Sequence, residues 1–385
     1  MRMRKIYYGA RRIVLIFFAF LFSPLIYVLI WRRRRRQDSD FRNLRILVIP
    51  HLTRIGDLAC ATPVFRAIKE KYPKSFLAVL VAGRLEGLLK QNPRVDELIR
   101  YRHNDLWGTI HGLRKKNFDW SFSLSGSAPS SCIAFLALIP RRAKLMRRPR
   151  PLSEIATDCM SNFKLLYRHH TYLPRRYLDL LAGMGIEHPE EVKEVFVSQA
   201  GEKKAEEFLR KEGIAPRDFL VGISITAGNK IKEWGDEKFR ELAGRIVDNY
   251  GAKIVFLASK NDEGRIEAIL FPGALKAVDF SLEELPSLIK RLKLFIAVDT
   301  GPIYIAHALK VPLIDIIGPV DPAEQPPQDE RSILIKPPPH IRPSSFVFKR
   351  AGKPDEHKKA LEATSVEDVL SGVDTLVRSK QIARS

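Results

Sequence analysis

The sequence predicts an α/β protein of two Rossmann-like domains that face each other across a cleft, with an apolar membrane segment at the N-terminus. Three observations predict this fold. Short apolar runs, typical of strands buried on both faces, alternate with stretches of helical period. The alternation occurs as two series in tandem. The length of 385 residues also suits two domains with additional segments.

We divide the chain into four parts on this pattern. Residues 1–40 form a basic and apolar anchor, and residues 41–200 form the N-terminal Rossmann-like domain. Residues 201–345 form the C-terminal Rossmann-like domain, and residues 346–385 form a loop and a closing helix.

The charge of the chain favours an anionic partner. The formal net charge is +21, and residues 1–36 contain ten Lys or Arg and no Asp or Glu. A nucleotide, a phosphorylated glycan or a membrane surface suits this charge. Nucleic acid fits less well, because no helix-turn-helix, zinc-finger or RNA-binding pattern is present. Cys60, Cys132 and Cys159 form no CxxC pair, which indicates buried thiols in a reducing compartment and no zinc site.

The N-terminal segment predicts contact with a membrane. Ile13 to Trp31 is a run of nineteen apolar residues, which as one helix would span roughly 28 Å. Pro24 permits a kink or a shallow insertion into one leaflet. No cleavage site of the signal-peptide type follows, because five arginines come directly after Trp31. We expect a membrane anchor or a monotopic insertion.

The stretch from Arg45 to Tyr72 predicts the first strand, a loop and a helix. Leu47 to Ile49 is a buried strand, and apolar residues from Leu58 to Tyr72 recur at helical spacing. The loop between them leaves the carboxyl end of the strand, where open α/β sheets bind their ligands. Gly56 permits close backbone approach, and Asp57 places a carboxylate beside the helix start. The alternative is that Asp57 only caps the helix.

The rest of the first domain continues the alternation. We expect strands over 76–83, 97–101 and 118–126, and helices over 85–90, 106–116 and 130–139. The basic stretch from Arg141 to Arg150 is either a solvated surface run or an anion-binding lip, with Arg141 and Arg142 as its candidate residues. Residues 151–200 are a partly helical connection.

The second series begins with a charged helix over 202–211. The expected strands are 219–228, 252–259, a short one near 277, 294–299 and 311–318. The expected helices are 236–250, 264–270, 282–290, one after residue 301, and a final amphipathic helix over 366–378.

Three loops of this second series leave carboxyl strand ends together. The first, Thr226 to Trp234, places Thr226 and Gly228 with Lys230 and Lys232, which are point charges suited to a phosphate. The second, residues 259–263, offers an acidic side chain to ribose hydroxyls. The third, Asp299-Thr300-Gly301, precedes a helix start, and amides at a helix start bind anions. Each loop alone is also compatible with a capping turn or a surface lysine, and neither a Walker A motif nor a complete GxGxxG is present.

The order of these motifs resembles glycosyltransferase family 9, the lipopolysaccharide heptosyltransferases. The likeness runs over about residues 44–380 and rests on ILVIPHLTRIGDLACATPVFRAIKEKYP, NPRVDELI, ITAGNKIKEWGDEKF, AVDTGPIYIAHALKVPLIDIIGPVDP and TSVEDVL. The resemblance implies a GT-B fold with the acceptor on the N-terminal domain and the donor on the C-terminal one. It implies inverting transfer of heptose from ADP-heptose to a lipid-linked or lipid A–core glycan, with no required metal and no cofactor. It implies the cytoplasmic face of the inner membrane.

The resemblance also assigns residues. Asp57 falls on the general base, beside Gly56 and Arg54 in the acceptor-side loop. Lys232 falls on a donor-phosphate contact, and the acidic ribose contact falls on Asp262 or Glu263. Asp299, Thr300 and Gly301 fall on the family's phosphate loop, in which Tyr304 stands where many members have His, with His307 one turn later.

Three other functions remain open at this point. A related transferase would use another nucleotide sugar and another anionic glycan. A sugar-nucleotide epimerase would interconvert the donor sugar without an acceptor. A membrane-tethered scaffold would bind nucleotides without turnover.

Overall fold

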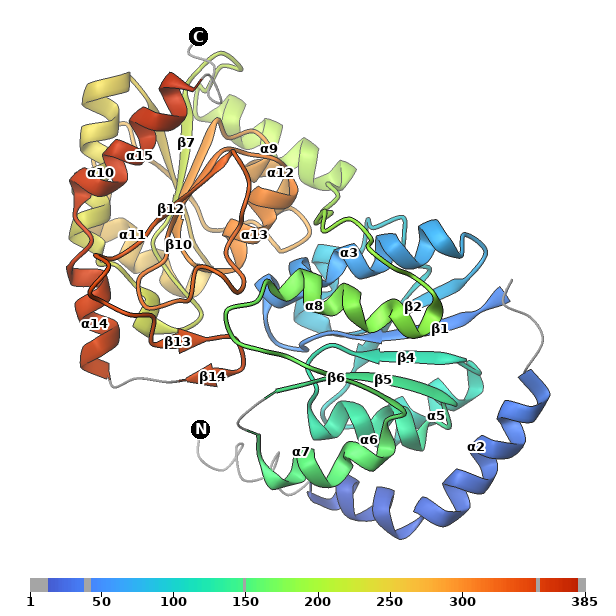
Figure 1. Ribbon diagram of the computed structural model, residues 1–385. Coiled ribbons are helices and arrows are strands. Elements are labelled where there is room, and N and C mark those ends of the chain that lie inside the picture. The colour runs from blue at the N-terminus through green and yellow to red at the C-terminus, as the bar shows by residue number, and fades with distance from the viewer. Residues whose placement is uncertain (1–12, 38–42, 148–149, 351–353, 380–385) are drawn as a thin grey trace. The chain divides into compact units, whose positions relative to one another are not determined.

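The computed structural model describes residues 13–37, 43–147, 150–350 and 354–379 (Figure 1). Over these residues the chain forms two compact units. The first comprises Met1–Thr53, Ala61–Glu86 and Asn92–Glu191, and the second comprises Arg54–Cys60, Gly87–Gln91 and Val192–Ser385. Each unit holds a parallel six-stranded sheet, which confirms the predicted α/β class with two Rossmann-like domains. The four-part division by residue number stays a prediction.

The sheet of the first unit has the order β3-β2-β1-β4-β5-β6. Val48 of β1 pairs with Val79 of β2 on one side and with Phe122 of β4 on the other. Because the strand order reverses between β1 and β4, the loops after these strands lie at the switch point, where ligands of open α/β sheets bind. The strands are β1 (Arg45–Ile49), β2 (Phe76–Ala82), β3 (Glu97–Tyr101), β4 (Trp120–Ser123), β5 (Arg141–Met146) and β6 (Phe163–Leu166).

Helices connect these strands, and their apolar residues form the core against the sheet. The described helices are α2 (Ser23–Gln37), α3 (Ile55–Lys71), α4 (Glu86–Leu89), α5 (Leu106–Lys115), α6 (Ala128–Leu136), α7 (Leu152–Ala156) and α8 (Leu173–Asp179). Strand β6 lies in the stretch for which we expected only a partly helical connection, so that expectation was incomplete.

The N-terminal apolar run is bent. The helices Ile13–Leu21 and Ser23–Arg33 meet at 67°, directly before Pro24. Proline lacks an amide hydrogen and clashes with the preceding turn, so it favours a break here. Among the described residues no single helix has the length and apolar composition to cross a membrane, although the two halves satisfy both conditions together. The run is thus not one continuous helix, and it bends near Pro24, where the sequence permitted a kink.

The sheet of the second unit has the order β12-β11-β10-β7-β8-β9, and its switch point lies between β10 and β7. Its strands are β7 (Leu220–Ser224), β8 (Lys253–Leu257), β9 (Leu275–Ala277), β10 (Leu294–Val298), β11 (Leu313–Ile316) and β12 (Ser332–Ile335). A separate small hairpin pairs β13 (Ser345–Phe346) with β14 (Lys349–Arg350).

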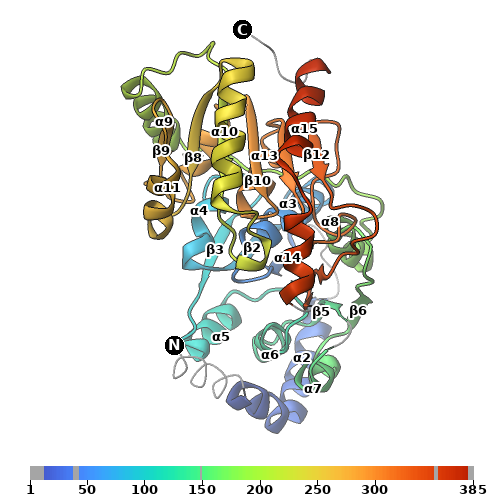
Figure 2. The same cartoon turned by 90° about the vertical axis from the view of Figure 1, so that its left-hand side faces the viewer.

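Helices cover both faces of this sheet. They are α9 (Gln199–Lys211), α10 (Asp236–Tyr250), α11 (Glu263–Ile269), α12 (Leu285–Ile289), α13 (Gly301–Ala308), α14 (Pro354–Glu362) and α15 (Val366–Arg378). Figures 1 and 2 show α15 beside α10, and Val369 and Val373 of α15 are fully buried in the shared core. A capping box between Ser365 and Asp368 starts α15. Neither β12 nor α14 was expected from the sequence.

Candidate active site

Asp57 lies in the first turn of α3, just beyond the carboxyl end of β1. Its side chain is 3% exposed, and Oδ1 accepts no hydrogen bond from any residue that the structure describes. Oδ2 lies 3.9 Å from Nη1 of the exposed Arg54. A buried, unpaired oxygen costs roughly 1–3 kcal/mol, whereas the helix start favours negative charge. A capping role therefore does not fit Oδ1.

Gly56 is required by close packing within the second unit. A Cβ at this position would lie 2.8 Å from the Tyr304 ring, closer than real Cβ contacts allow. A Cβ on Gly301 would likewise lie 2.7 Å from Cβ of Ile55. The expectation that Gly56 serves close approach is therefore confirmed, and the neighbour is a side chain of α13.

The predicted phosphate loops leave neighbouring strands of the second sheet. The loops after β7 and β10 flank the switch point, and the loop after β8 follows on the next strand. Nζ of Lys232 pairs with Oδ2 of Asp299, and it also lies 3.3 Å from the Asp299 carbonyl oxygen. This ion pair joins the first loop to the third. The side chain of Lys232 is 22% exposed.

Tyr304 holds the other oxygen of Asp299. Its hydroxyl donates to Oδ1 of Asp299, and the side chain is buried. Burial, together with the Asp299 charge, raises the pKa of Tyr304 well above 10.0, so the phenol stays a donor. Tyr304 and Lys232 thus fix both oxygens of Asp299, a network that the sequence did not indicate.

His307, one turn after Tyr304, pairs with residues other than Asp299. Its Nε2 lies 3.4 Å from Oδ2 of Asp329, and its Nδ1 lies 3.4 Å from Nζ of Lys193. Burial lowers the pKa of His307 below 6.5, so the ring is neutral near pH 7.

Thr300 occupies the N-cap position of α13 in an extended conformation, and its side chain makes no capping hydrogen bond. The interpretation of this loop as a capping turn therefore does not hold for the Thr300 hydroxyl. Pro302 lies in the first turn, where its missing amide hydrogen costs nothing. The amide of Ile303 donates to the Thr300 carbonyl at 3.1 Å, so the Thr300 hydroxyl and the Gly301 amide are the donors that this helix start offers to an anion. Thr226, half-buried, follows β7 at the same edge of the sheet.

The two acidic candidates for the ribose differ in their partners. Oδ2 of Asp262 accepts a hydrogen bond of 2.6 Å from the Ser259 hydroxyl in the same turn. Glu263 instead forms a 2.7 Å ion pair with Lys276 of β9. Because an ion pair restrains a carboxylate more than one local hydroxyl does, Asp262 is the better placed of the two.

Arg265 of α11 positions the first loop, and the sequence did not indicate it. Its guanidinium lies 3.1 Å from Oε2 of Glu233 and 2.5 Å from Oδ1 of Asp236. These two carboxylates raise the pKa of Arg265, with the hydrogen bond to Asp236 as the largest cause. The paired charges tie the segment between Lys232 and α10 to the neighbouring helix.

Asp315 of β11 is a second unexpected carboxyl group. It is fully buried, and neither carboxylate oxygen has a hydrogen-bond partner among the described residues. Burial raises its pKa well above 3.8, and the charge of Asp299 adds to this, whereas Lys232 lowers it. The folded protein therefore keeps this carboxyl group protonated to higher pH than an exposed aspartate would be.

We expect Asp315→Asn to stabilise the protein near pH 7 and to have little effect near pH 4. The folded protein retains a proton that the unfolded chain releases above 3.8. Native stability therefore falls as pH rises toward the folded pKa, by at most about 1.4 kcal/mol per pH unit. Asparagine abolishes this dependence. Urea unfolding of both proteins across this range measures it, and a variant less stable than the wild type by the same amount at every pH would contradict it.

The first half of the basic stretch is not a solvated run, and Arg142 is not available to an anion-binding lip, whereas the assignment of Arg141 to such a lip stays a prediction. Arg141 to Met146 form strand β5, in which Arg142 and Lys144 are buried. The Arg142 guanidinium donates to the backbone carbonyls of Ile139, Pro140 and Met160. The guanidinium of Arg141 lies over the Trp120 ring. Arg142 is therefore a structural residue, because its guanidinium makes its hydrogen bonds to backbone carbonyls inside the first unit.

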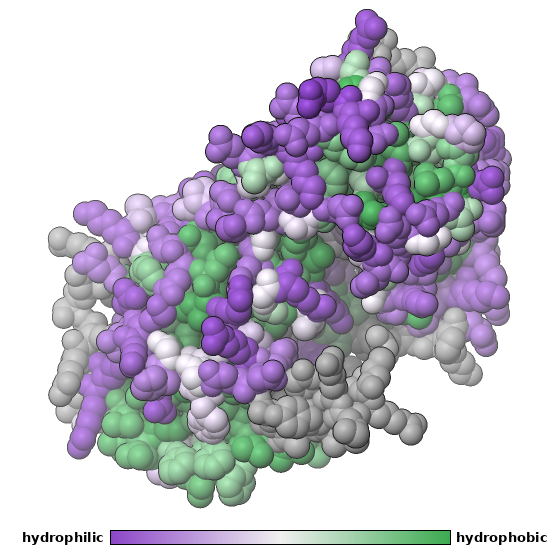
Figure 3. Space-filling model, turned by 180° about the vertical axis from the view of Figure 1, so that it is seen from behind, coloured by the Kyte–Doolittle hydropathy of each residue, from purple (hydrophilic) through white to green (hydrophobic). Residues whose placement is uncertain are grey.

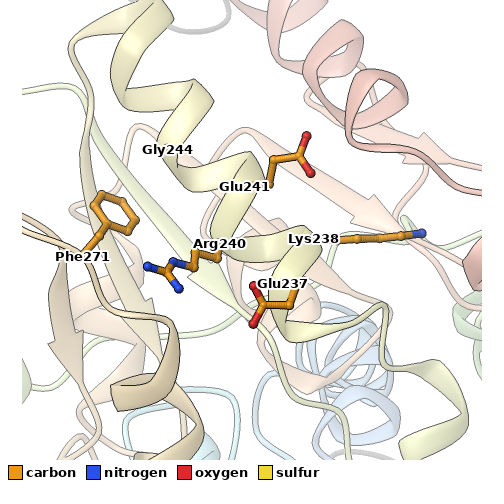
Figure 4. Close-up of a pocket in the computed structure, with 6 residues that line it drawn as sticks. All are labelled: Glu237, Lys238, Arg240, Glu241, Gly244 and Phe271. Carbon is orange, nitrogen blue, oxygen red and sulfur yellow. The ribbon is translucent and has the colours of Figure 1, made fainter.

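Within the parts of the chain that the structure describes, neither a metal cluster nor the hollow on α10 coincides with the predicted residues. Among the described residues no three His, Cys, Asp or Glu side chains are grouped to hold a metal ion. A surface hollow lies on α10, where Figure 4 shows Arg240 extending toward Phe271 and Lys238 pointing the other way. It contains none of the predicted residues; its lining is Glu237, Lys238, Arg240, Glu241, Gly244 and Phe271.

Two doubly wound parallel sheets, each with a switch point in its strand order, define an α/β protein of the GT-B class. The family model described as glycosyltransferase family 9 (heptosyltransferase) matches residues 106–341, more than half of the chain. The chain belongs to this family, which confirms the resemblance seen in the sequence.

Individual relatives agree with this assignment. Lipopolysaccharide heptosyltransferase 2 of Salmonella typhimurium is 25% identical over 313 residues, covering 76% of this chain and 88% of the relative. The glycosyl transferase family 9 structure from Veillonella parvula has a TM-score of 0.73 at 20% identity, over 89% of this chain and 99% of that one. The E. coli ADP-heptose LPS heptosyltransferase II structure has a TM-score of 0.71 at 20% identity, over 88% and 100%.

Proposed function

We propose that this chain is an inverting, metal-independent heptosyltransferase. It transfers heptose from ADP-heptose to a lipopolysaccharide-core type of acceptor, with Asp57 as the general base. Family membership and the names of the relatives support the donor and the acceptor class. The observation that carries the role of Asp57 is its buried carboxylate oxygen, Oδ1, which no described residue hydrogen-bonds.

The reaction needs a base where the acceptor attacks. The acceptor hydroxyl passes its proton to Asp57 while its oxygen bonds to the anomeric carbon. The bond from that carbon to the phosphate oxygen breaks, and ADP leaves with the electron pair. A single displacement inverts the anomeric carbon and needs only one carboxylate. A positioned base contributes about 10²–10⁴-fold to the rate.

The second unit binds the donor in this proposal. Lys232 and the Thr300–Gly301 helix start stabilise the charge that develops on the departing diphosphate. Asp299 positions Lys232, because the two side chains form an ion pair. Asp262 accepts from the ribose, and Thr226 lines the same edge.

Arg54 contacts the anionic acceptor beside Asp57. Its side chain is 54% exposed and lies next to the base. Arg142 has no role here, because its guanidinium is buried on backbone carbonyls. We place the enzyme at the inner membrane with its catalytic units on the cytoplasmic face, which suits three free cysteines and a nucleotide donor. Cys60 and Cys132 are buried as expected, whereas Cys159 is exposed, so the expectation of buried thiols is wrong for Cys159.

Nucleotide competition and acceptor dependence test this proposal. We expect ADP to displace a labelled ADP-sugar at lower concentration than UDP or GDP. We also expect ADP release from ADP-heptose to require a deep-rough lipid A–core acceptor. Preference for UDP or GDP would support a transferase with another donor, and altered ADP-heptose without acceptor would support an epimerase. Nucleotide binding without any turnover of ADP-heptose would support a scaffold that has no enzymatic activity.

A further inference from the structure

The N-terminal helix pair packs on the first unit through one face. Leu15 and Ala19 of the first helix and Ile26 and Ile30 of the second are at most 7% exposed. They share a core with residues of β1, α5 and α6, such as Leu47, Ile110 and Phe135. Arg33 donates to the carbonyls of Phe118 and Leu138, at 3.1 and 3.2 Å, and so ties the second helix to the same unit.

The opposite face of the pair is apolar and exposed. Figure 3 shows hydrophobic surface gathered at the lower left, the end of the first unit where these helices lie. The exposed apolar side chains on the two helices are Ile13, Val14, Phe17, Phe20, Leu21, Phe22, Leu25, Tyr27, Val28, Leu29 and Trp31, each between 37% and 69% exposed.

Neighbouring helices extend this face. The Trp107 ring of α5 lies 5.5 Å from the Phe18 ring, and Trp107 is 48% exposed. The Tyr27 hydroxyl donates to the Cys159 carbonyl, directly after α7, at 2.7 Å. On α7 itself Leu152 is 83% exposed and Ile155 is 46% exposed. Exposed apolar area of this extent marks an interaction surface.

The bend and the buried face argue against a membrane span. The first helix has nine residues, and the part of α2 whose composition suits a membrane, Ser23–Arg33, has eleven, so the two apolar stretches reach only about 14–17 Å each, half of a hydrocarbon core of about 30 Å. A straightened span would also have to withdraw Leu15, Ala19, Ile26 and Ile30 from the core of the first unit.

The charge of the N-terminal segment indicates what occupies this face. Residues 1–36 contain ten Lys or Arg and no acidic residue. A two-fold contact between copies would bring like charges together, whereas anionic headgroups would pair with them. Tyr27 and Trp31 are aromatic residues of the kind that lie at the boundary between headgroups and acyl chains. We propose that the outer face of the helix pair docks on the anionic leaflet of a bilayer, in which the pair lies within one leaflet without crossing it.

Vesicle binding of the full chain tests this docking surface. We expect binding to phosphatidylcholine vesicles containing phosphatidylglycerol, and the double variant Leu21→Ser/Leu25→Ser should weaken it by on the order of 100-fold, about tenfold per leucine. The matched control is Val192→Ser, which removes an exposed apolar side chain of the second unit and should leave binding unchanged. Equal binding by the double variant and the wild type would overturn the proposal.

A sidedness experiment separates docking from spanning. In a Cys159→Ser background, Arg12→Cys and Arg32→Cys place single thiols on either side of the apolar run, since Cys60 and Cys132 are buried. We expect a membrane-impermeant thiol reagent, added outside preformed vesicles, to label both positions. Labelling of only one would show a span and overturn the proposal. A second result would also overturn the proposal. This would be a wild-type dimer, detected by light scattering, that becomes a monomer in the double variant while vesicle binding stays unchanged. None of these measurements depends on heptose transfer.

Discussion

Asp57→Asn is expected to lower turnover by about 10²–10⁴-fold while ADP-heptose binding changes little. Asparagine keeps the shape of the side chain but cannot accept the acceptor's proton. The loss corresponds to about 2.7–5.5 kcal/mol of transition-state stabilisation. Steady-state transfer assays give the rate, and calorimetric titration with ADP-heptose gives the affinity.

Glu70→Gln is the matched control for this prediction. Glu70 is a carboxylate on the same helix, and its side chain pairs with Arg66 one turn away at 2.6 Å. Neutralising it should cost no more than a surface ion pair, about 0–1 kcal/mol of stability, with the rate retained. If Asp57→Asn lost donor affinity and folding stability in step with its rate, Asp57 would be a structural residue.

Lys232→Ala is expected to weaken ADP-heptose binding by about 10- to 150-fold. A hydrogen bond to a charged group contributes roughly 1.5–3 kcal/mol, and the donor diphosphate loses this contact. Titration with ADP and with ADP-heptose measures the effect. Lys230→Ala is the control from the same loop, since Lys230 is exposed and has no ion pair with a described residue.

A second variant separates binding from folding. Lys232→Ala leaves the buried Asp299 without its cation, which can destabilise the loop by itself. Lys232→Met combined with Asp299→Asn removes both charges and should still bind the donor weakly. Recovery of wild-type affinity in this double variant would mean that Lys232 acts only by compensating Asp299.

Strong hydrophobic periodicity made most of the fold predictable. The helices over 236–250 and 366–378 begin and end at the expected residues, because each has a sustained apolar stripe between clear ends. Strands β6 and β12 were missed because edge strands are only partly buried, so their sequences lack a long apolar run. The bend before Pro24 was foreseeable from proline, whereas the packing of the helix pair was not.

The sequence predicted which loops form the candidate site, but not which side chains contact one another there. Asp57, Lys232 and Thr300 stand beside strand ends that the apolar pattern locates. The Tyr304–Asp299–Lys232 network joins residues up to 72 positions apart, and local patterns carry no information on such pairing. Arg142 was wrongly predicted to lie at the surface, because here a local pattern suggested a role that the structure does not show. A basic run suggests a surface, but the guanidinium here satisfies three backbone carbonyls inside the unit.

The mass of the acceptor after incubation with ADP-heptose tests the central claim most directly. The full chain and a deep-rough lipid A–core acceptor would be incubated together, and the product would be analysed by mass spectrometry and by NMR of the anomeric centre. We predict the addition of one heptose residue, with the anomeric configuration inverted relative to the donor, by the wild type and not by Asp57→Asn. An unmodified acceptor, a retained configuration, or equal product from both proteins would contradict this account.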